Sequence, residues 1–390
     1  MPSWTVSPTP CHIGVPACSR TTRCWPPAAA SWWPSCCTGW VCGISNRRAD
    51  RVPPRRRCRA ESAPPRRRPV NKTLIVGADV GGTSVKYALV DAAGRQFRQG
   101  EIPTDPEDPA GTIERLAATV QDDLPGERRI AGVGLACAGI VSPQTGLLGR
   151  SPNLPGWENS DLAGAIRAAF GAVHQTVAND VNAALYGEYR FGAGRGCQHL
   201  VMIALGTGVG GGVLVDGTLL TGFADGAGEI GHMVLELDGA PCPCGNRGCL
   251  EAYCGSVGIV RRARELARGD GATDRWSAMV DARGDDLTTR DCYDLAVERD
   301  PTALALFAEV GRRLGQAVSS LVNVIAPDRL IVGGGVAQAG DLVLGPCREM
   351  VAAHVMSSAG QNTPVVLAEL GPFAAAMGAS ALVTESGATP

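Results

Sequence analysis

Four side chains between residues 232 and 249 have the types and the spacing of a tetrahedral metal site. They are His232, Cys242, Cys244 and Cys249. Three thiolates and one imidazole complete the ligand set that Zn²⁺ takes in structural sites. A disulfide cluster is disfavoured, because no apolar stretch near the N-terminus makes a credible export signal, and nucleic-acid-binding zinc fingers need a different spacing. The pattern therefore predicts a structural zinc ion.

Asn179 and Asp180 stand between an expected strand and an expected helix. A carboxylate here could accept the proton of a substrate hydroxyl while that hydroxyl attacks a phosphoryl group. Asp is also a common N-cap residue, whose side chain accepts hydrogen bonds from the first backbone N–H groups of a helix. The local sequence leaves both interpretations open.

Three glycine-rich segments have the composition of phosphate-binding turns. In the first, Asp79–Thr83 (DVGGT), backbone N–H groups can approach an anion closely, Thr83 adds a hydroxyl, and Asp79 could hold a hydrated Mg²⁺. The second is Gly206–Gly212, and the third, Gly333–Gly335, ends a strand, where open α/β sheets bind nucleotides. Each alone could be an ordinary turn, but three in this order favour a nucleotide site. Neither a GxxxxGK[ST] loop nor a protein-kinase catalytic loop occurs.

Two glutamates adjoin the predicted metal ligands. Glu229 precedes His232 by three residues, and Glu251 follows Cys249 by two. A bound metal would fix both carboxylates, which suit vicinal sugar hydroxyls because they accept paired O–H hydrogen bonds. Both glutamates could instead be surface charges.

The elements that position these residues follow from the hydrophobic pattern. Strand, glycine-rich turn and strand occur twice, which predicts two related α/β domains with a ligand cleft between them. We expect strands at 73–79, 85–91, 130–137, 173–178, 200–205, 213–216 and 329–332, and helices at 112–122, 161–170, 181–191, 301–325 and 373–383.

Residues 1–70 differ from the rest of the chain in composition. They contain twelve Arg against two acidic residues, and neither Leu nor Phe. They could be a basic nucleic-acid-binding arm, or an export signal whose apolar stretch is interrupted by Pro34, Ser35 and Thr38. We favour a disordered extension or sequence upstream of the true start, because this composition cannot build a core. No apolar run is long enough to span a bilayer.

Taken together, these residues resemble the ROK family (repressors, open reading frames, kinases) of the actin-like sugar kinase superfamily, and within it the bacterial glucokinases. The resemblance covers residues 72–385. It implies an α/β fold of two actin-like (ribonuclease H-like) domains with the active site in the cleft between them. The small domain would span residues 71–180 and take in the C-terminal helix at 373–390, and the large domain, residues 181–372, would carry the zinc motif. The motifs are DVGGT at 79–83, NLPGW at 153–157, ANDVNAA at 178–184, GTGVGGG at 206–212, GEIGH at 228–232 and CPCGNRGCLEAY at 242–253.

The resemblance also implies a role for each site residue. Asp180 would be the catalytic base, and Asp79 would position Mg²⁺–ATP. His232 would give one ring nitrogen to zinc and offer the other to the sugar. A fourth thiol, Cys254, is not part of the family motif, and we expect it in the core. The sugar would be bound by Asn153, Asn179, Asp180, Glu229, His232 and Glu251, and the nucleotide by Asp79, Gly81, Gly82, Thr83, Lys86, Gly206, Thr207, Gly208, Gly333, Gly334 and Gly335.

The expected reaction is transfer of the γ-phosphoryl group of ATP to the 6-hydroxyl of glucose. We expect a cytoplasmic dimer or tetramer that binds neither nucleic acid nor membrane. The first alternative is a kinase for mannose, N-acetylglucosamine, N-acetylmannosamine or a related hexose. The second is a sugar-responsive repressor, which would need an N-terminal winged helix-turn-helix, and residues 1–70 lack the apolar residues for its amphipathic helices.

Overall fold

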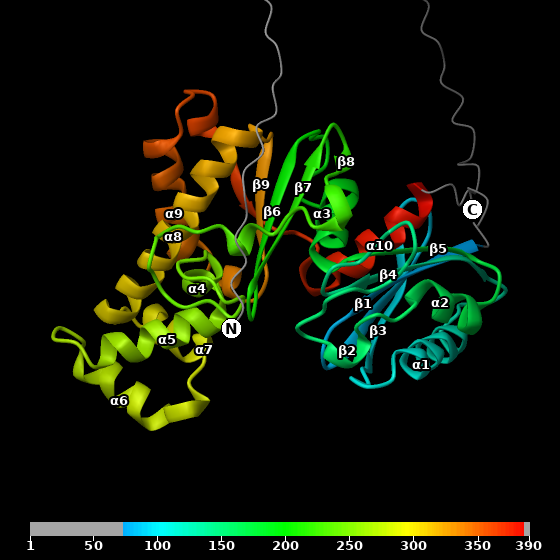
Figure 1. Cartoon of the computed structure of the whole chain (residues 1–390), viewed down its shortest axis with the longest axis horizontal. Helices are drawn as coiled ribbons and strands as arrows, with labels where there is room; N and C mark the ends of the chain where they lie inside the picture. Colours follow the sequence, from blue (N-terminus) through cyan, green and yellow to red (C-terminus); the bar gives the residue numbers. More distant parts are fainter. Residues whose placement is uncertain (1–72, 386–390) are drawn as a thin grey trace, which may run out of the picture. The chain divides into compact units, whose positions relative to one another are not determined.

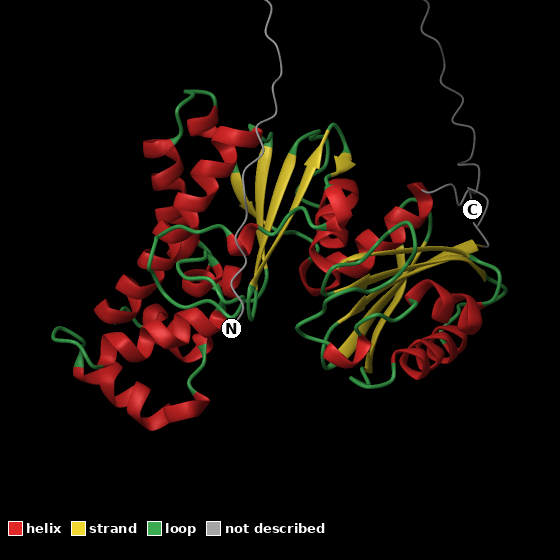
Figure 2. Ribbon diagram, viewed as in Figure 1, coloured by secondary structure: helices red, strands yellow, loops and turns green. Residues whose placement is uncertain are grey.

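The computed structural model describes residues 73–385, and their strands form two five-stranded sheets with helices packed against them (Figures 1 and 2). Residues 1–70, which we interpret above as a disordered extension or upstream sequence, lie outside the described residues. The strands are β1 (Thr73–Val80), β2 (Ser84–Val90), β3 (Gln96–Pro103), β4 (Arg129–Cys137), β5 (His174–Asn179), β6 (Leu200–Leu205), β7 (Val209–Val215), β8 (Thr218–Leu219), β9 (Arg329–Gly333) and β10 (Val365–Leu367). The α-helices are α1 (Pro109–Asp122), α2 (Leu162–Phe170), α3 (Asp180–Phe191), α4 (Glu251–Cys254), α5 (Ser256–Ala267), α6 (Asp274–Arg283), α7 (Thr289–Val297), α8 (Pro301–Ile325), α9 (Asp341–His354) and α10 (Ala374–Glu385).

The first sheet has the strand order β3-β2-β1-β4-β5. Strands β1, β2 and β3 are antiparallel neighbours, whereas β4 and β5 run parallel to β1. Leu74 and Val76 of β1 pack on one face with Ile113 of α1, and Ile75 packs on the other face with Met377 of α10. Because both faces are covered, β1 is a continuous apolar run rather than an alternating one.

The second sheet repeats this topology, with the order β10-β9-β6-β7-β8. Strands β6, β7 and β8 are antiparallel, and β9 and β10 run parallel to β6. The long helix α8 is capped by Asp300, as predicted, and its apolar stripe (Leu314 and Val318) packs with Val201 and Ile203 of β6. The shared strand order confirms the prediction of two related α/β domains. The residue boundary at 180/181 stays a prediction.

Helices α3 and α10 pack closely against each other and connect the two sheets. One apolar cluster contains Leu185 of α3, Ala375 of α10, Met202 of β6 and Ala136 of β4. The crossing needs a glycine, because a Cβ at Gly378 would lie 1.6 Å from the carbonyl oxygen of Ala183. Figure 1 shows α10, in red, beside α3. The chain passes from the first sheet to the second after α3, and it returns from the second sheet to the first before α10.

The structure contains elements that the sequence analysis did not predict, namely strands β3, β8 and β10 and helices α4, α5, α6, α7 and α9. Strand β3 was not expected, because it is an edge strand whose side chains are mostly polar and exposed. Strand β7 begins at Val209 and not at Val213, so Gly210–Gly212 lie in a strand rather than in a loop. A Cβ at Gly210 would lie 2.5 Å from Val181 Cγ2, so this glycine makes room for α3.

No helix within residues 73–385 combines the length and the apolar character needed to cross a membrane.

Candidate active site and metal centre

Asp79 and Asp180 lie at the same end of the first sheet. Asp79 pairs with Ala136 of β4, and Ala136 pairs with Ala178 of β5, so Asp79 and Ala178 are in register two strands apart. Asp180 is the first residue of α3, two positions after Ala178. The carboxyl ends of parallel strands meet at one sheet edge, where α/β folds bind ligands. The sheet register therefore brings the two predicted carboxylates together.

The N-cap of α3 is Asn179 and not Asp180. Asn179 Oδ1 accepts hydrogen bonds from the backbone N–H groups of Val181 and Asn182, each at 3.0 Å. Asn179 Nδ2 donates to the Gly139 carbonyl at 3.1 Å and to Asp180 Oδ1 at 2.9 Å. The capping role thus belongs to Asn179, which also orients the Asp180 carboxylate.

Burial raises the pKa of Asp180. The backbone N–H of Val181 and the side chain of Asn179 oppose this rise in pKa, and the charge of Glu229 adds to it. A half-buried carboxylate that is held by hydrogen-bond donors is typical of an active-site acid or base.

Burial and the neighbouring charge of Asp180 raise the pKa of Asp79 to about 7, and Lys86 opposes the rise. Lys86 stands directly opposite Asp79 in the β1–β2 pair. The buried thiol of Cys137, at the end of β4, also has a raised pKa, through burial and then through Asp180 and Asp79. Two carboxyls and one lysine therefore share this sheet edge, a suitable set for a hydrated Mg²⁺ and a phosphate chain.

The first glycine-rich segment forms a tight turn between β1 and β2. Thr104 Oγ1 donates to the Gly81 carbonyl at 2.8 Å, and the Thr104 N–H donates to the Thr83 carbonyl at 3.0 Å. A Cβ at Gly82 would lie 3.1 Å from the Asn153 carbonyl oxygen, so the exposed Asn153 lies beside this turn. Sequence analysis missed Thr104, because this residue follows the unpredicted strand β3.

The second and third glycine-rich segments lie at one edge of the second sheet. Strands β6 and β9 are parallel neighbours, with Ala204 opposite Gly333. Gly334 has a φ of 89°, and a Cβ there would lie 2.3 Å from the Leu205 carbonyl oxygen, so only glycine fits. The turn Gly206–Gly208 starts from the same Leu205. Together these segments offer backbone N–H groups to an anion, and their contact with a nucleotide stays a prediction.

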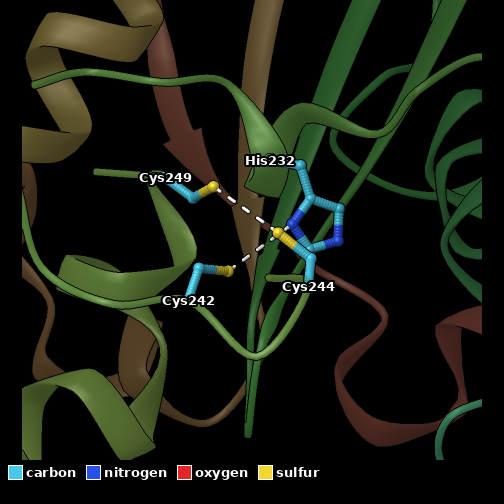
Figure 3. A group of neighbouring side chains, drawn as sticks. All are labelled: His232, Cys242, Cys244 and Cys249. Carbon is cyan, nitrogen blue, oxygen red and sulfur yellow. Dashed lines mark hydrogen bonds between the residues drawn. The ribbon is translucent and has the colours of Figure 1, made fainter. Parts of the chain in front are cut away.

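The four predicted metal ligands converge on one point, and their ligand atoms all lie within 4.8 Å of one another (Figure 3). The sulfurs of Cys244 and Cys249 are 3.8 Å apart, and Cys242 Sγ is 3.8 Å from His232 Nδ1. A tetrahedral ion with Zn–S bonds of about 2.3 Å holds its sulfurs about 3.8 Å apart. The donor set and its spacing therefore fit zinc.

His232 and Glu229 connect this cluster to Asp180. His232 Nδ1 faces the thiols, whereas His232 Nε2 lies 3.9 Å from Glu229 Oε2. In this orientation one ring nitrogen can bind a metal while the other serves a second partner. The negative charge of Glu229 also contributes to the raised pKa of Asp180.

Glu251 begins α4, and its carboxylate has two partners. Glu251 Oε2 accepts a hydrogen bond from the N–H of Val209 at 2.9 Å, directly after the turn Gly206–Gly208. Glu251 Oε1 lies 3.7 Å from Cys242 Sγ, a predicted metal ligand. The structure thus places this predicted sugar ligand between a glycine-rich turn and the metal cluster, a position that sequence spacing did not reveal.

Residues 75–386, most of the chain, match the ROK family. The protein belongs to the ROK family. Its relatives include bacterial glucokinases. The glucokinase of Thermotoga maritima is 35% identical over 319 residues, which cover 80% of this chain and 98% of that protein. The glucokinase of Halalkalibacterium halodurans is 34% identical over 319 residues, which cover 80% of this chain and 94% of that protein.

The fold is similar to that of a ROK family glucokinase from Streptomyces griseus, solved in complex with glucose and AMPPNP. The TM-score is 0.69 and the identity 31%, over 80% of this chain and 99% of that chain. The two-sheet α/β architecture is therefore the actin-like fold of ROK sugar kinases, as the motifs predicted.

This ROK chain fixes the loop that carries the predicted metal ligands to α8, through residues that sequence analysis did not single out. Glu236 Oε2 accepts hydrogen bonds from the Tyr253 hydroxyl at 3.0 Å and from Arg313 Nη2 at 2.9 Å. The Arg313 guanidinium also lies 4.5 Å from the centre of the Tyr253 ring. Gln316 Nε2 donates to the Leu235 carbonyl at 3.1 Å. These partners are far apart in sequence, so no local pattern marks them.

Proposed function

We propose that this ROK protein transfers the γ-phosphoryl group of ATP to the 6-hydroxyl of glucose. The observation that carries the proposal is the Asp180 carboxylate, which is half-buried, oriented by Asn179, raised in pKa by the charge of Glu229 and close enough to Asp79 to raise the pKa of that carboxyl in turn. The similarity to ROK glucokinases, one of them solved with glucose and AMPPNP, supports the choice of sugar and donor.

In the proposed step, the O6 atom of glucose attacks the γ-phosphorus. The O6–phosphorus bond forms, the bond from the γ-phosphorus to the bridging oxygen breaks, and ADP leaves with that electron pair. The O6 proton passes to Asp180, whose raised pKa strengthens it as a base. Because the transition state of phosphoryl transfer is loose, positioning by Asn179 should matter more than base strength.

Nucleotide binding is assigned to the three glycine-rich segments and the charged pair beside the first of them. Mg²⁺ held by Asp79 would offset the negative charge of the phosphates. Lys86 would contribute a positive charge opposite Asp79, in agreement with its effect on the pKa of Asp79. The nucleotide ligands of the proposal are Gly81, Gly82, Thr83, Lys86, Gly206, Thr207, Gly208, Gly333, Gly334 and Gly335.

Sugar binding is assigned to residues that surround Asp180 and the metal cluster, in the cleft expected between the two domains. Glu229 and the Nε2 atom of His232 face each other, so both can meet neighbouring sugar hydroxyls. Zinc would act as a brace for these side chains and would take no part in the chemistry. The sugar ligands of the proposal are Asn153, Asn179, Asp180, Glu229, His232 and Glu251.

The proposal includes a cytoplasmic dimer or tetramer that binds neither membrane nor nucleic acid. Another hexose or an N-acetylhexosamine is the nearest alternative substrate, because mannose, N-acetylglucosamine and N-acetylmannosamine differ from glucose only at carbon 2. A coupled ADP-release assay tests the proposal with glucose, mannose, N-acetylglucosamine and N-acetylmannosamine, each with ATP or polyphosphate as donor. We expect the highest kcat/KM with glucose and ATP. Binding of operator-like DNA without any turnover would instead indicate a repressor.

A further inference from the structure

The turn Gly206–Gly208 is held at both ends by the chain segment that follows the last metal ligand. At its start, the Gly206 carbonyl accepts a hydrogen bond from the Ser256 N–H at 2.9 Å. At its end, the Val209 N–H donates to Glu251 Oε2 at 2.9 Å. Glu251 is the first residue of the short helix α4, and Ser256 begins the next helix, α5. The turn and the metal-binding segment are therefore built as one unit.

Glu251 also lies in direct contact with the turn itself. A Cβ at Gly208 would lie 2.2 Å from Glu251 Oε2, so the glutamate occupies the space that a side chain at position 208 would fill. On its other side, Glu251 Oε1 lies 3.7 Å from Cys242 Sγ. One carboxylate thus spans the distance from the metal cluster to the backbone of the turn.

We propose that Glu251 is a positioning residue that couples the metal cluster to the nucleotide site. The proposal rests on the proposed function, because it takes the turn Gly206–Gly208 as part of the phosphate-binding surface. Loss of the carboxylate leaves the Val209 N–H without its acceptor and the end of the turn unanchored. Nucleotide affinity then falls even when no sugar is present, an effect that a sugar ligand alone does not produce.

The test is calorimetric binding of Mg²⁺ and a non-hydrolysable ATP analogue to the full chain without sugar, with zinc content measured on the same samples. Glu251→Ala should raise the Kd for the nucleotide about tenfold while zinc is retained, since a hydrogen bond to a charged acceptor is lost. Glu251→Gln should stay within about threefold of wild type, because its amide oxygen can still accept from Val209. Hydrogen exchange of a peptide covering residues 206–212 should quicken in Glu251→Ala.

Glu229→Ala is the matched control. It removes a carboxylate near His232 that has no hydrogen bond to the turn among those the structure describes, so its nucleotide Kd should equal that of wild type. If Glu251→Ala changes neither the nucleotide Kd nor the hydrogen exchange of residues 206–212, the coupling role of Glu251 is overturned, while the proposed function is unaffected. An equal loss of affinity in Glu229→Ala would overturn it too. A wild-type protein that binds no nucleotide would overturn the proposed function and, with it, this inference.

A double substitution tests the contact with Gly208 independently of any ligand. Gly208→Ala should lower the thermal midpoint of wild type, because its Cβ meets Glu251 Oε2. In the Glu251→Ala background that contact is gone, so the same change should lower the midpoint far less. Additive effects of the two substitutions would contradict the contact.

Discussion

Asn179 donates a 2.9 Å hydrogen bond to the carboxylate of Asp180 and at the same time caps the helix that Asp180 begins. One oxygen of Asn179 accepts from two backbone N–H groups, while its nitrogen holds the neighbouring carboxylate. The position of Asp180 is therefore set by the start of α3, and the start of α3 is set by Asn179.

This relationship predicts different effects for two substitutions of Asn179. Asn179→Ala should lower the free energy of unfolding by about 1 kcal/mol, because the cap is lost. Asn179→Asp keeps a capping oxygen but loses the donor and adds a like charge, so the pKa of Asp180 should rise further. Asp180 would then ionise only at higher pH, and the acid limb of the kcat profile should move to higher pH. An acid limb that stays in place in Asn179→Asp would contradict this account.

Asp79 makes stability depend on pH in a direction unusual for an aspartate. Its pKa is raised from 3.8 unfolded to about 7 folded, so the folded protein holds a proton that the unfolded chain releases. The resulting stability is present below pH 3.8 and is lost as the pH rises through about 7. Asp79→Asn should therefore stabilise the nucleotide-free protein by about 4 kcal/mol at pH 8 and by less than half of that at pH 5, because the loss of stability begins above pH 3.8. Urea unfolding at both pH values checks this, and an equal difference at the two would count against it.

Loss of a metal ligand should affect sugar binding. Cys244 is exposed, so Cys244→Ser should leave the core intact while the zinc content falls. Glucose affinity should fall with it, because His232 and Glu229 would no longer be held in position. Metal analysis and glucose titration measure the two quantities. Glucose affinity that survives zinc loss would disprove the link through His232.

Cys254→Ala is the matched control for this experiment. Cys254 is fully buried, as predicted, and its Sγ lies 3.5 Å from the Val310 carbonyl rather than in the metal cluster. The control variant should retain both zinc and glucose affinity.

Glu188 is a buried carboxylate that joins the two chain segments leading from one sheet to the other. It is 0% exposed, and it accepts hydrogen bonds from the Ala193 N–H at 2.7 Å and the Leu370 N–H at 2.8 Å. Glu188→Ala should cost about 3 kcal/mol in urea unfolding, because two backbone donors lose their acceptor. The exposed Glu369 is the control, and Glu369→Ala should change stability by less than about 0.5 kcal/mol. Equal stabilities of the two variants would contradict the role of Glu188.

Some features built from neighbouring residues could be predicted from the sequence, whereas individual contacts between distant residues could not. The predicted metal ligands lie within a short segment and come together in the structure, and Asp300 stands directly before the helix it caps, so local spacing was enough to single out both. The edge strand β3 has no apolar alternation, and for this reason β3 and the Thr104 that follows it were missed. The contact from Glu251 to Val209 joins residues brought together only by folding. The glycines of β7 were assigned to a loop because packing against α3 has no signature in the local sequence.

The central claim is that Asp180 takes the proton of the sugar hydroxyl. The direct test is a coupled assay of Asp180→Asn beside wild type, with glucose binding measured by calorimetry on the same preparations. The amide is close in shape but cannot accept the proton, so kcat should fall by roughly 10³-fold or more, while the glucose Kd stays within about tenfold. Turnover within about tenfold of wild type would remove Asp180 from the role of base.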